Sequence, residues 1–499
     1  MDTQRIRERV REIYPQGQDA VAELVVTLIA ELAAQLESVA VRVAALEAEN
    51  ATLRRENATL RAQLGTNSHN SSKPPSSDGP GIKPHPKSQR VRSGRKPGGQ
   101  PGHPGHTLAL VDAPDEIQVH RPDVCQACGQ SLEEVPAVRW ERRQVVDLPP
   151  VRVRVVEHHA ETIPCPRCAG ETTAPFPAGV EAPIQYGPGV ATVAVYLNQE
   201  QLIPLERTSQ VLAELFGCPL SERTVERAVG VCYEQLTGVD AAIRQGIAGA
   251  AVAHFDETGV NIGGKGHWLH VASTARLTCY AAQPKRGRAA MDAMGVLPHF
   301  RGRAVHDGLA SYWQYEQCTH ALCNAHHLRE LTFVEEQLGQ PWAQELKELL
   351  REMKQVVDEA REHGMAAVPV EVTRELERRY DVLLVAGLEA NPRPPPTGKP
   401  GRPKRGKAGS LVDRLREHKG AALAFLDDVR VPFDNNQAER DIRMTKVRQK
   451  ISGCFRTSTG ADRFCRIRGY ISTLRKQGMP ILSALGKTMA GAPPMPVTT

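Results

Sequence analysis

The chain has 499 residues, a hydrophobic content of 40% and a formal net charge of +6. One compact core does not accommodate this length, so we expect three or more domains. No stretch reaches the ~18 uncharged apolar residues of a membrane span and the first residues are polar, which predicts a cytoplasmic protein without membrane partners. Eleven cysteines, an odd number and mostly scattered, exclude a secreted disulfide framework.

Residues 1–64 are predicted to form a coiled-coil dimerisation helix. From residue 22 to residue 64, apolar positions recur in steps of three and four through six heptads. Asn50 and Asn57 fall on a positions, where polar side chains set the register and favour two parallel strands. We therefore expect a homodimer or higher oligomer; the alternative is a helix packed within its own chain.

Residues 65–110 are predicted to be a flexible basic linker. The segment is rich in Gly, Pro and Ser, and it has too few apolar side chains to offset the entropy of ordering. Its basic residues, Arg95 and Lys96 among them, occur without any Asp or Glu between residues 81 and 111. This charge favours contact with DNA backbone, although a solvated tail is the plain alternative.

Residues 111–180 are predicted to form a zinc-ribbon-like β module. Cys125 and Cys128 form one C-x-x-C knuckle, and Cys165 and Cys168 form another. Four thiolates close a tetrahedral structural zinc site and leave no open position for catalysis. The spacing between the knuckles is long for a ribbon, but the alternating run 151–159 predicts a strand and a long hairpin. Chance pairs of reduced cysteines are the alternative.

Residues 181–245 are predicted to form a helical, helix-turn-helix-like domain. The stretch 202–236 indicates a helix, a short turn containing Gly217, and a second helix opened by Ser221. This arrangement is compatible with major-groove recognition, with Arg223 and Arg227 as DNA contacts. Helix pairs joined by a glycine turn are also common in domains that bind no DNA.

Residues 246–333 change in texture to strands. An apolar run that leads to Asp256 and Glu257 predicts a first strand. A glycine-rich turn and two further antiparallel strands are predicted to follow. A short helix and another buried strand ending at Asp307 complete the segment. We take 246–333 as the first part of an α/β core.

Residues 334–430 switch to helices with an apolar stripe. They enclose a second basic Pro/Gly linker whose "GRPKRGK" resembles a minor-groove AT-hook, with Arg402 and Lys404 as contacts. Residues 431–490 are predicted to hold the final acidic helix and a C-terminal helix, and 491–499 a disordered tail.

Three acids stand out as candidate catalytic groups. Asp256 and Asp307 follow apolar strands, and Glu439 lies in a helix that Asp434 and Gln437 are expected to cap. Strand ends and a helix face converge in an α/β layer fold. Carboxylates suit two Mg²⁺ ions about 3.5–4 Å apart, which stabilise the attacking and leaving oxygens of phosphoryl transfer. With 57 acids in the chain, spacing alone is weak support.

The same residues carry a family resemblance. The blocks "HFDETGVNIGGKGHWLHVAST", "GRAVHDGLASY", "CNAHHLREL" and "DNNQAERDIRMTKVRQKISGCFRTSTGADRFCRIRGY" occur in order along the chain. Together with "GRKPGGQPGHPG", the paired knuckles and the leading zipper, they resemble the insertion sequence 66 family of bacterial DDE transposases. The resemblance covers nearly the whole chain, and its last block is the most specific.

This resemblance implies an RNase H-like catalytic core interrupted by a helical insertion before its final acidic helix. It makes Asp256, Asp307 and Glu439 the triad that holds Mg²⁺ or Mn²⁺. Asn435, Asn436 and Arg440 would orient Glu439 or hold a phosphate, and Glu257 would be a supporting or solvent carboxylate. Cys323 and His326 match the family's C-x-x-H element; we favour a packed, hydrogen-bonded role over a zinc site there.

Basic residues after Glu439 complete the candidate DNA surface, with a solvated helix face as the alternative. The predicted contacts are Arg440, Arg443, Lys446, Arg448 and Arg456, and Lys450, Arg463, Arg466 and Arg468 belong to the same basic run.

The sequence therefore predicts a nucleoid-associated transposase that binds the terminal inverted repeats of its own element. We expect it to pair the ends and to perform metal-dependent strand cleavage and transfer into target DNA. Accessory proteins of the same element are conceivable partners. Two rivals are a sequence-specific DNA-binding regulator with an inactive core and a structure-selective nuclease on the same core.

Overall fold

The computed structural model describes residues 3–67, 70, 71, 102, 108–149, 151–393 and 405–498. The chain divides into two compact units that alternate along the sequence. The first comprises Met1–His85, Arg303–Trp313 and Thr319–Asn435, and the second Pro86–Gly302, Gln314–Cys318 and Asn436–Thr499. Most of the predicted linker 65–110 lies outside the described residues, as do Arg95, Lys96, Arg402 and Lys404.

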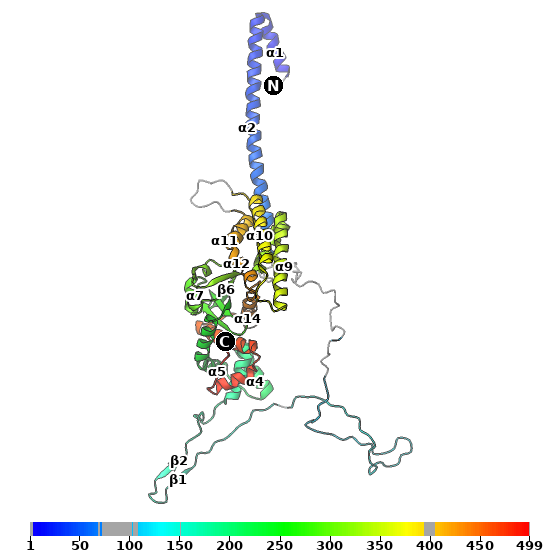
Figure 1. Cartoon of the computed structure of the whole chain (residues 1–499), viewed down its shortest axis with the longest axis vertical. Coiled ribbons are helices and arrows are strands. Elements are labelled where there is room, and N and C mark those ends of the chain that lie inside the picture. The colour runs from blue at the N-terminus through cyan, green and yellow to red at the C-terminus, as the bar shows by residue number, and fades with distance from the viewer. Residues whose placement is uncertain are drawn as a thin grey trace. The chain divides into compact units, whose positions relative to one another are not determined.

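A helical hairpin begins the first unit. Helix α1 (Thr3–Ile13) and the 3₁₀ turn η1 (Tyr14–Gln16) run back along the long helix α2 (Gln18–Leu64), as Figure 1 shows. Gly17 reverses the chain with a φ of 99°, a region that glycine enters without steric cost. At 1.5 Å per residue α2 is about 70 Å long. The predicted long helix is present, and its oligomeric role stays a prediction.

The apolar seam of α2 is exposed. Ile29, Leu36 and Leu60 are 61%, 62% and 59% exposed, and so large an uncovered stripe calls for a partner. The part Gln18–Asn50 is also long and apolar enough to cross a membrane. Glu31 and Glu37 lie within it, and carboxylates inside a bilayer are costly. One such helix is weak evidence for a span, so a protein partner explains the heptad pattern better.

The zinc module contains only one short pair of strands among its described residues. Strands β1 (Thr162–Pro164) and β2 (Glu171–Thr173) are antiparallel and flank the second knuckle. The strand predicted at 151–159 is wrong, because these residues adopt no regular structure. Its valines are exposed, Val155 at 87%, so alternation there has no apolar surface to cover and no neighbouring strand to pair with.

Helices fill the next part of the second unit. They are α3 (Pro188–Val195), the π-helical turn η3 (Tyr196–Glu200), α4 (Leu205–Phe216), α5 (Glu222–Gln235) and α6 (Thr237–Ala248). Gly217 ends α4 in the left-handed region, and the Ser221 hydroxyl caps α5 by accepting from the Thr224 N–H. The predicted helix, turn and helix are therefore present.

A five-stranded sheet follows in the order β5-β4-β3-β6-β7. Strands β3 (Val252–Ile262), β4 (Lys265–Ser273) and β5 (Thr278–Gln283) form an antiparallel meander, whereas β6 (Arg303–His306) and β7 (Thr319–Leu322) are parallel to each other. Gly263 and Gly264 both have positive φ, as a two-residue hairpin turn between right-twisted strands requires. The predicted meander is confirmed.

One face of the meander is covered by C-terminal helices of the same unit. Helix α14 (Asn436–Ser452) contacts β3 and β4, and α15 (Ser458–Lys476) contacts β5. Val260, Leu269 and Tyr280 from the strands pack with Ile442 and Phe464 from the helices. Helix α16 (Ile481–Met489) lies against α3 and α5, and α7 (Arg288–Met294) with the turn η4 (Leu297–His299) follows β5 in sequence.

The remaining helices belong to the first unit and follow the turn η5 (Tyr312–Gln314) and β7. They are α8 (Asn324–Leu338), α9 (Pro341–Glu362), α10 (Val370–Ala390), α11 (Lys407–Glu417), α12 (Lys419–Ala422) and α13 (Ala424–Asp427). The apolar stripe predicted on α9 is buried, since Leu346, Leu350 and Met353 are fully inaccessible. Stripe residues of this kind hold the helices together as a bundle.

Close approach between α15 and β5 depends on Gly469. A Cβ added there would lie 3.0 Å from the carbonyl oxygen of Thr278 and 3.4 Å from the Cα of Cys279. We expect Gly469→Leu to lower the free energy of unfolding by about 1–3 kcal/mol through overpacking. Thermal and denaturant unfolding of the full chain measure it. Gly238→Ala is the matched control, because its Cβ meets nothing within 4 Å; an equal loss in both variants would contradict the close approach.

Candidate active site and zinc module

Asp256 occupies the middle of β3, not its end as predicted. It pairs with Val271 of β4, and the register of the hairpin is regular from His254 to Ile262. Side chains of a strand alternate between faces, so Asp256 shares its face with Val260 and Ile262, which pack against α14. Within the second unit, Asp256 and the helix that carries Glu439 therefore belong to the same face of the sheet.

Glu257 points to the opposite face and is not a solvent carboxylate. Its side chain is fully buried, and Arg286 donates to it at 2.7 Å. Arg286 also lies over the Trp268 ring, 4.8 Å from its centroid. Glu257 is therefore a paired, buried carboxylate on the central strand of the sheet, and Asp256 is the acid directed towards α14.

Asp307 begins the loop after β6 in the first unit. Its Oδ1 accepts a hydrogen bond of 2.9 Å from the Leu309 N–H, and the intervening Gly308 has a φ of 92°. Left-handed backbone at this position favours glycine. The backbone of the turn thus fixes the Asp307 carboxylate.

His306 supports the Asp307 loop from inside the core. Its Nδ1 accepts from the Gly308 N–H at 3.0 Å, so its Nε2 carries the proton and donates to His320 Nδ1, also at 3.0 Å. The ring is fully buried and stacks on Tyr312 at 4.5 Å. Burial lowers the pKa of His306 well below its ordinary value, and His320 and His418 add to this. His306 was not among the residues predicted from the sequence, although it immediately precedes Asp307.

Glu439 lies in the first turn of α14, where the partial positive charge of a helix N-terminus favours a carboxylate. The helix begins at Asn436, so Gln437 does not close the predicted capping box with Asp434. Its amide instead donates to Asp441 at 3.1 Å. The following residue Arg440 is exposed, and its Nε donates to the Asn436 carbonyl at 3.3 Å.

A buried ion pair fastens α14 to the sheet. Lys476 of α15 lies 2.8 Å from Asp441, and both side chains are about nine-tenths buried, with exposures of 11% and 10%. Lys476 also donates to the carbonyls of Thr274 and Leu277 at the β4–β5 turn, and the Tyr280 hydroxyl donates to the Asp441 carbonyl at 2.9 Å. This Lys476–Asp441 clamp holds α14 two residues from Glu439. Burial lowers the pKa of Lys476, and the charge of Asp441 opposes that shift.

The β7–α8 junction is a second anchor, within the first unit. Cys323 Sγ accepts from the Asn435 N–H at 3.2 Å, and the Asn324 N–H donates to the Phe433 carbonyl at 3.0 Å. Asn324 also donates to Ala422 and contacts the ring of His327 at 2.9 Å. These bonds secure the segment that leads into α14, which agrees with a packed role for Cys323.

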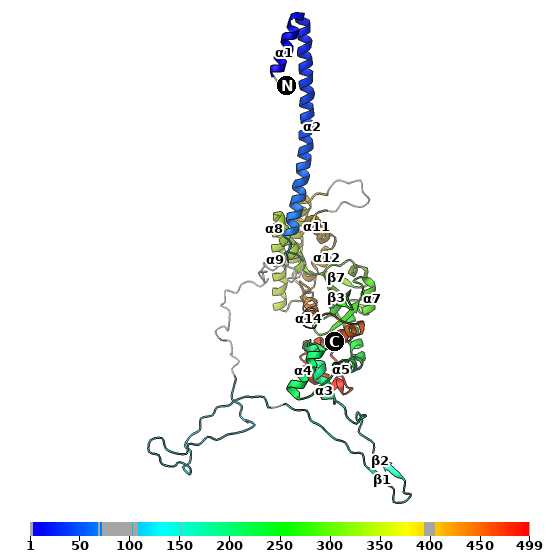
Figure 2. The ribbon, with the colours of Figure 1, turned by 180° about the vertical axis from the view of Figure 1, so that it is seen from behind.

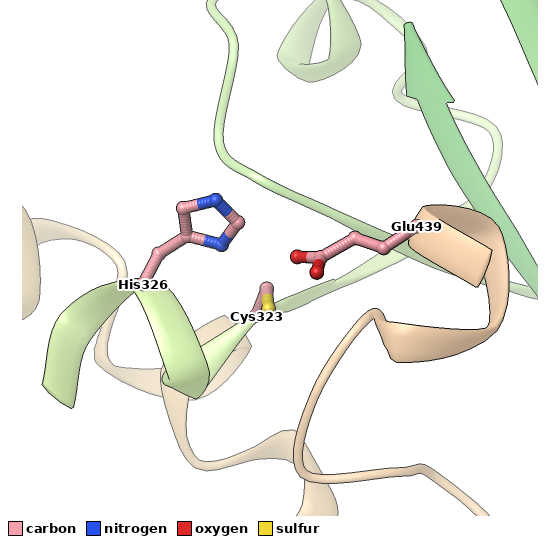
Figure 3. A group of neighbouring side chains, drawn as sticks. All are labelled: Cys323, His326 and Glu439. Atoms are coloured by element: carbon pink, nitrogen blue, oxygen red, sulfur yellow. The ribbon is translucent and has the colours of Figure 1, made fainter. Parts of the chain in front are cut away.

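His326 follows on the first turn of α8. Burial lowers the pKa of His326 to about 4, Arg329 lowers it further and Asp307 acts in the opposite direction. The imidazole of His326 is therefore neutral at physiological pH. One ligand atom each from Cys323, His326 and Glu439 lies within 4.8 Å of the others, and Figure 3 shows these side chains. Among the described residues, neither Asp256 nor Asp307 belongs to such a group.

The two cysteine knuckles have the same backbone geometry. In the first, the Cys125 N–H donates to the Gln130 carbonyl at 2.8 Å, and the Gly129 N–H donates to the Cys125 carbonyl at 2.9 Å. In the second, the Cys165 N–H donates to the Gly170 carbonyl and the Ala169 N–H donates to the Cys165 carbonyl. Gly129 and Ala169 both have positive φ, 74° and 60°. Each turn thus directs two sulfurs to one side, as zinc knuckles require.

Backbone N–H groups favour thiolate in both knuckles. They lower the pKa of Cys125 through Ala127 and Cys128, and that of Cys165 through Arg167 and Cys168. Thiolate is the zinc ligand, so each pair fits the metal. Among the described residues, the two pairs do not come within metal-binding distance as one group of four.

Comparison with known protein families decides the identity. A model described as "Transposase IS66 family" matches residues 183–463, which is more than half of the chain. The chain belongs to the IS66 transposase family. A model of the zinc-finger binding domain of transposase IS66 matches residues 122–169, and a family of unknown function, DUF6444, matches residues 12–109. No curated protein gave a match.

Membership of the IS66 family supports a multidomain transposase with a structural zinc module and a DNA partner. The zinc-finger match contains both knuckles, and the assignment of Cys125, Cys128, Cys165 and Cys168 as the metal-binding set stays a prediction. The transposase match spans Asp256, Asp307 and Glu439. It also contains the helix pair α4–α5.

The structure separates the basic residues that are exposed from those that are engaged internally. Exposed predicted contacts are Arg223, Arg227, Arg440, Arg443, Lys446 and Arg456. Of these, Lys446 also donates to the Gly259 carbonyl of β3 at 2.8 Å. Arg448 instead stacks on Phe455 at 3.8 Å, and burial lowers its pKa to about 10. Arg466 lies 3.7 Å from the Tyr233 ring centroid, and Arg468 pairs with buried Glu200 at 2.5 Å. Basic character alone did not reveal these packing roles.

We expect one zinc ion per chain in the purified protein, measured by elemental analysis and by release with a thiol reagent. Cys128→Ser and Cys168→Ser should each abolish stoichiometric zinc, because a three-thiolate site binds zinc far more weakly. Cys454→Ser is the matched control, since Cys454 is exposed and lies outside both knuckles. Retention of zinc after either knuckle substitution would count against a shared site.

Removing the clamp on α14 should destabilise the second unit. We expect Lys476→Met to cost about 3–5 kcal/mol, because it leaves the buried Asp441 carboxylate unpaired. Denaturant unfolding measures this, with Lys450→Met as the control on an exposed lysine of α14. An Asp441→Asn/Lys476→Met double variant should recover part of the loss; a double variant as unstable as the single one would exclude charge pairing as the cause.

Proposed function

We propose that this chain is a DDE transposase that cuts the ends of its own insertion element and joins them to target DNA. Family membership supports the general activity. The observation that carries the specific mechanism is the placement of three acids on separate, internally braced elements. Asp256 is mid-strand, Asp307 is in a hydrogen-bonded turn, and Glu439 is in the first turn of a clamped helix.

The sheet supports this reading. Three antiparallel strands continue into two parallel strands in the order β5-β4-β3-β6-β7. We propose that this is the RNase H-like core implied by the family resemblance, interrupted by the helices α9 to α13 before α14. The domain boundaries predicted from the sequence stay predictions, except that the tail expected to be disordered from residue 491 is held at the end of α15. The Tyr470 hydroxyl donates to the Pro494 carbonyl at 3.1 Å, and Gln477 exchanges two hydrogen bonds of 2.9 Å with Val497.

The donor set fits hard divalent cations. Carboxylates prefer Mg²⁺ or Mn²⁺, which when bound supply charge stabilisation and an acidified water for phosphodiester chemistry. In hydrolysis, water oxygen bonds to phosphorus while the bond to the 3′ oxygen breaks, and that oxygen takes a proton to become a 3′-OH. In strand transfer, this hydroxyl attacks a target phosphodiester, loses its proton and displaces the target 3′ oxygen.

The residues of the chain would position the DNA and the acids. His306 and Lys476 hold the elements that carry Asp307 and Glu439. Exposed Arg440 and Arg443, three residues apart on α14, would contact phosphates beside Glu439. Arg448 is withdrawn from the proposed DNA surface because it packs on Phe455 and Phe464.

The outer modules would recognise the ends and bring them together. Arg223 and Arg227 are exposed one turn apart on α5, as a helix-turn-helix contact with DNA requires. The zinc module would add a rigid DNA-binding surface, and α2 would form a parallel homodimer through its exposed seam. We also propose a cytoplasmic, nucleoid-associated location, and proteins of the same element are candidate accessory partners.

Cleavage of DNA carrying the element's ends tests the mechanism. We expect Mg²⁺-dependent strand cleavage by the wild-type chain, and a loss of at least about 100-fold in Glu439→Gln with DNA binding retained. Glu257→Gln is the control carboxylate, on the opposite face of β3. Equal cleavage by wild type and Glu439→Gln would refute the site, binding without cleavage in wild type would favour a regulator, and cleavage irrespective of end sequence would favour a nuclease.

A further inference from the structure

The C-terminal end of the long helix α2 is followed by a turn that side-chain hydrogen bonds close. Asn70 accepts from the Asn67 N–H at 2.8 Å and donates to the Gly65 carbonyl at 2.8 Å, so its amide closes the turn from both sides. The Ser71 hydroxyl donates to the Asn67 carbonyl at 2.6 Å, and Asn70 is only 2% exposed. Residues 65–71 were predicted to begin the linker, yet the described residues among them, 65–67, 70 and 71, form a closed turn at the end of α2.

The turn lies on the helical insertion of the same unit. Gly65 is packed so closely that an added Cβ would collide with the side-chain oxygen of Gln337 on α8. Lys407, the first residue of α11, donates to the Thr66 hydroxyl at 3.2 Å and lies 4.2 Å from the Phe333 ring centroid. Figure 2 shows this end of α2 beside α8 and α11.

The receiving surface is itself rigid. Glu330 of α8 forms an ion pair with Arg414 of α11, and Arg405 pairs with Asp413 at 2.9 Å. Phe333 and Val334 of α8 are 4% and 1% exposed. Helices tied by buried apolar residues and by ion pairs transmit position as one body.

Helix α8 connects this surface to the candidate active site. Its C-terminal half carries Phe333 and Gln337, and its N-terminal end begins beside Cys323 and includes His326. Fifteen residues at 1.5 Å each span about 22 Å, with no break in the helix. The same helix therefore touches the end of α2 at one end and neighbours Asp307 electrostatically at the other.

We propose that the turn formed by residues 65–67, 70 and 71 is the joint through which the α2 zipper sets the position of each catalytic unit, so that two DNA ends are cut in one assembly. The inference rests on the proposed transposase function. Without this joint, α2 would reach the insertion only through the linker, the zinc module and the helical domain. A covalent connection of that length does not by itself set the relative orientation of two units.

Cross-linking tests whether the joint exists in solution and within one chain. In the full-length protein, Gly65→Cys/Gln337→Cys should form a disulfide under mild oxidation, and mass spectrometry should find the linked peptides within single chains. Gly65→Cys/Leu338→Cys is the matched control, because Leu338 is exposed and faces a different side of α8. No bond above the control, or a bond only between chains, would overturn the proposal.

Cleavage of paired ends tests the function of the joint. Lys407→Glu and Asn70→Ala should remain dimers by light scattering and should nick a single DNA end within about twofold of wild type. Concerted cleavage of two ends should fall about tenfold, since misplacement of reacting groups lowers rate without removing them. Lys354→Glu on α9 is the control for charge change on the insertion.

The outcomes separate the two proposals. Unchanged concerted cleavage in both joint variants would overturn the inference while leaving the transposase function intact. Absence of any Mg²⁺-dependent nicking by wild type would overturn the proposed function, and the cross-link would still decide whether the joint exists.

Discussion

Carboxylates that share divalent cations repel one another until the cations bind, so each must be held by groups other than its partners. The chain meets this requirement separately for each candidate acid. Asp256 is held by the regular pairing of β3 with β4, Asp307 by the Leu309 N–H and the His306 support of its turn, and Glu439 by a helix clamped through Asp441 and Lys476.

Many of the contacts that hold these elements together are ion pairs with at least one buried side chain. Glu200 is 2% exposed at its side chain and receives both Arg468 and Arg475 from α15. Glu257 with Arg286 serves the opposite face of the sheet. Breaking such pairs leaves an uncompensated charge in a medium of low polarity, so these pairs confer a specific arrangement of elements around the acids.

The outer modules obey a different constraint because they carry little core of their own. Each cysteine knuckle closes by two local hydrogen bonds, and the residues around it are exposed. Small modules of this kind depend on metal for folding energy. Helix α2 likewise has a long exposed seam and buries little of its own surface, whereas the sheet and the insertion are stabilised by internal packing.

The sequence by itself determined the periodic and local features: the long heptad helix, the two knuckles, the helix pair around Gly217, the β3–β5 meander and the family. These follow from side-chain periodicity and turn chemistry within a short window. Tertiary structure alone decided that Asp256 lies mid-strand, that residues 151–159 form no strand, and that Arg448 and Arg468 are packed internally. It also decided that Lys476 contacts Asp441, that His306 accepts from Gly308, and that Gly65 lies against Gln337. The local sequence around a charged residue or a glycine does not tell whether it is exposed or packed, because its role depends on neighbours that are distant in the chain.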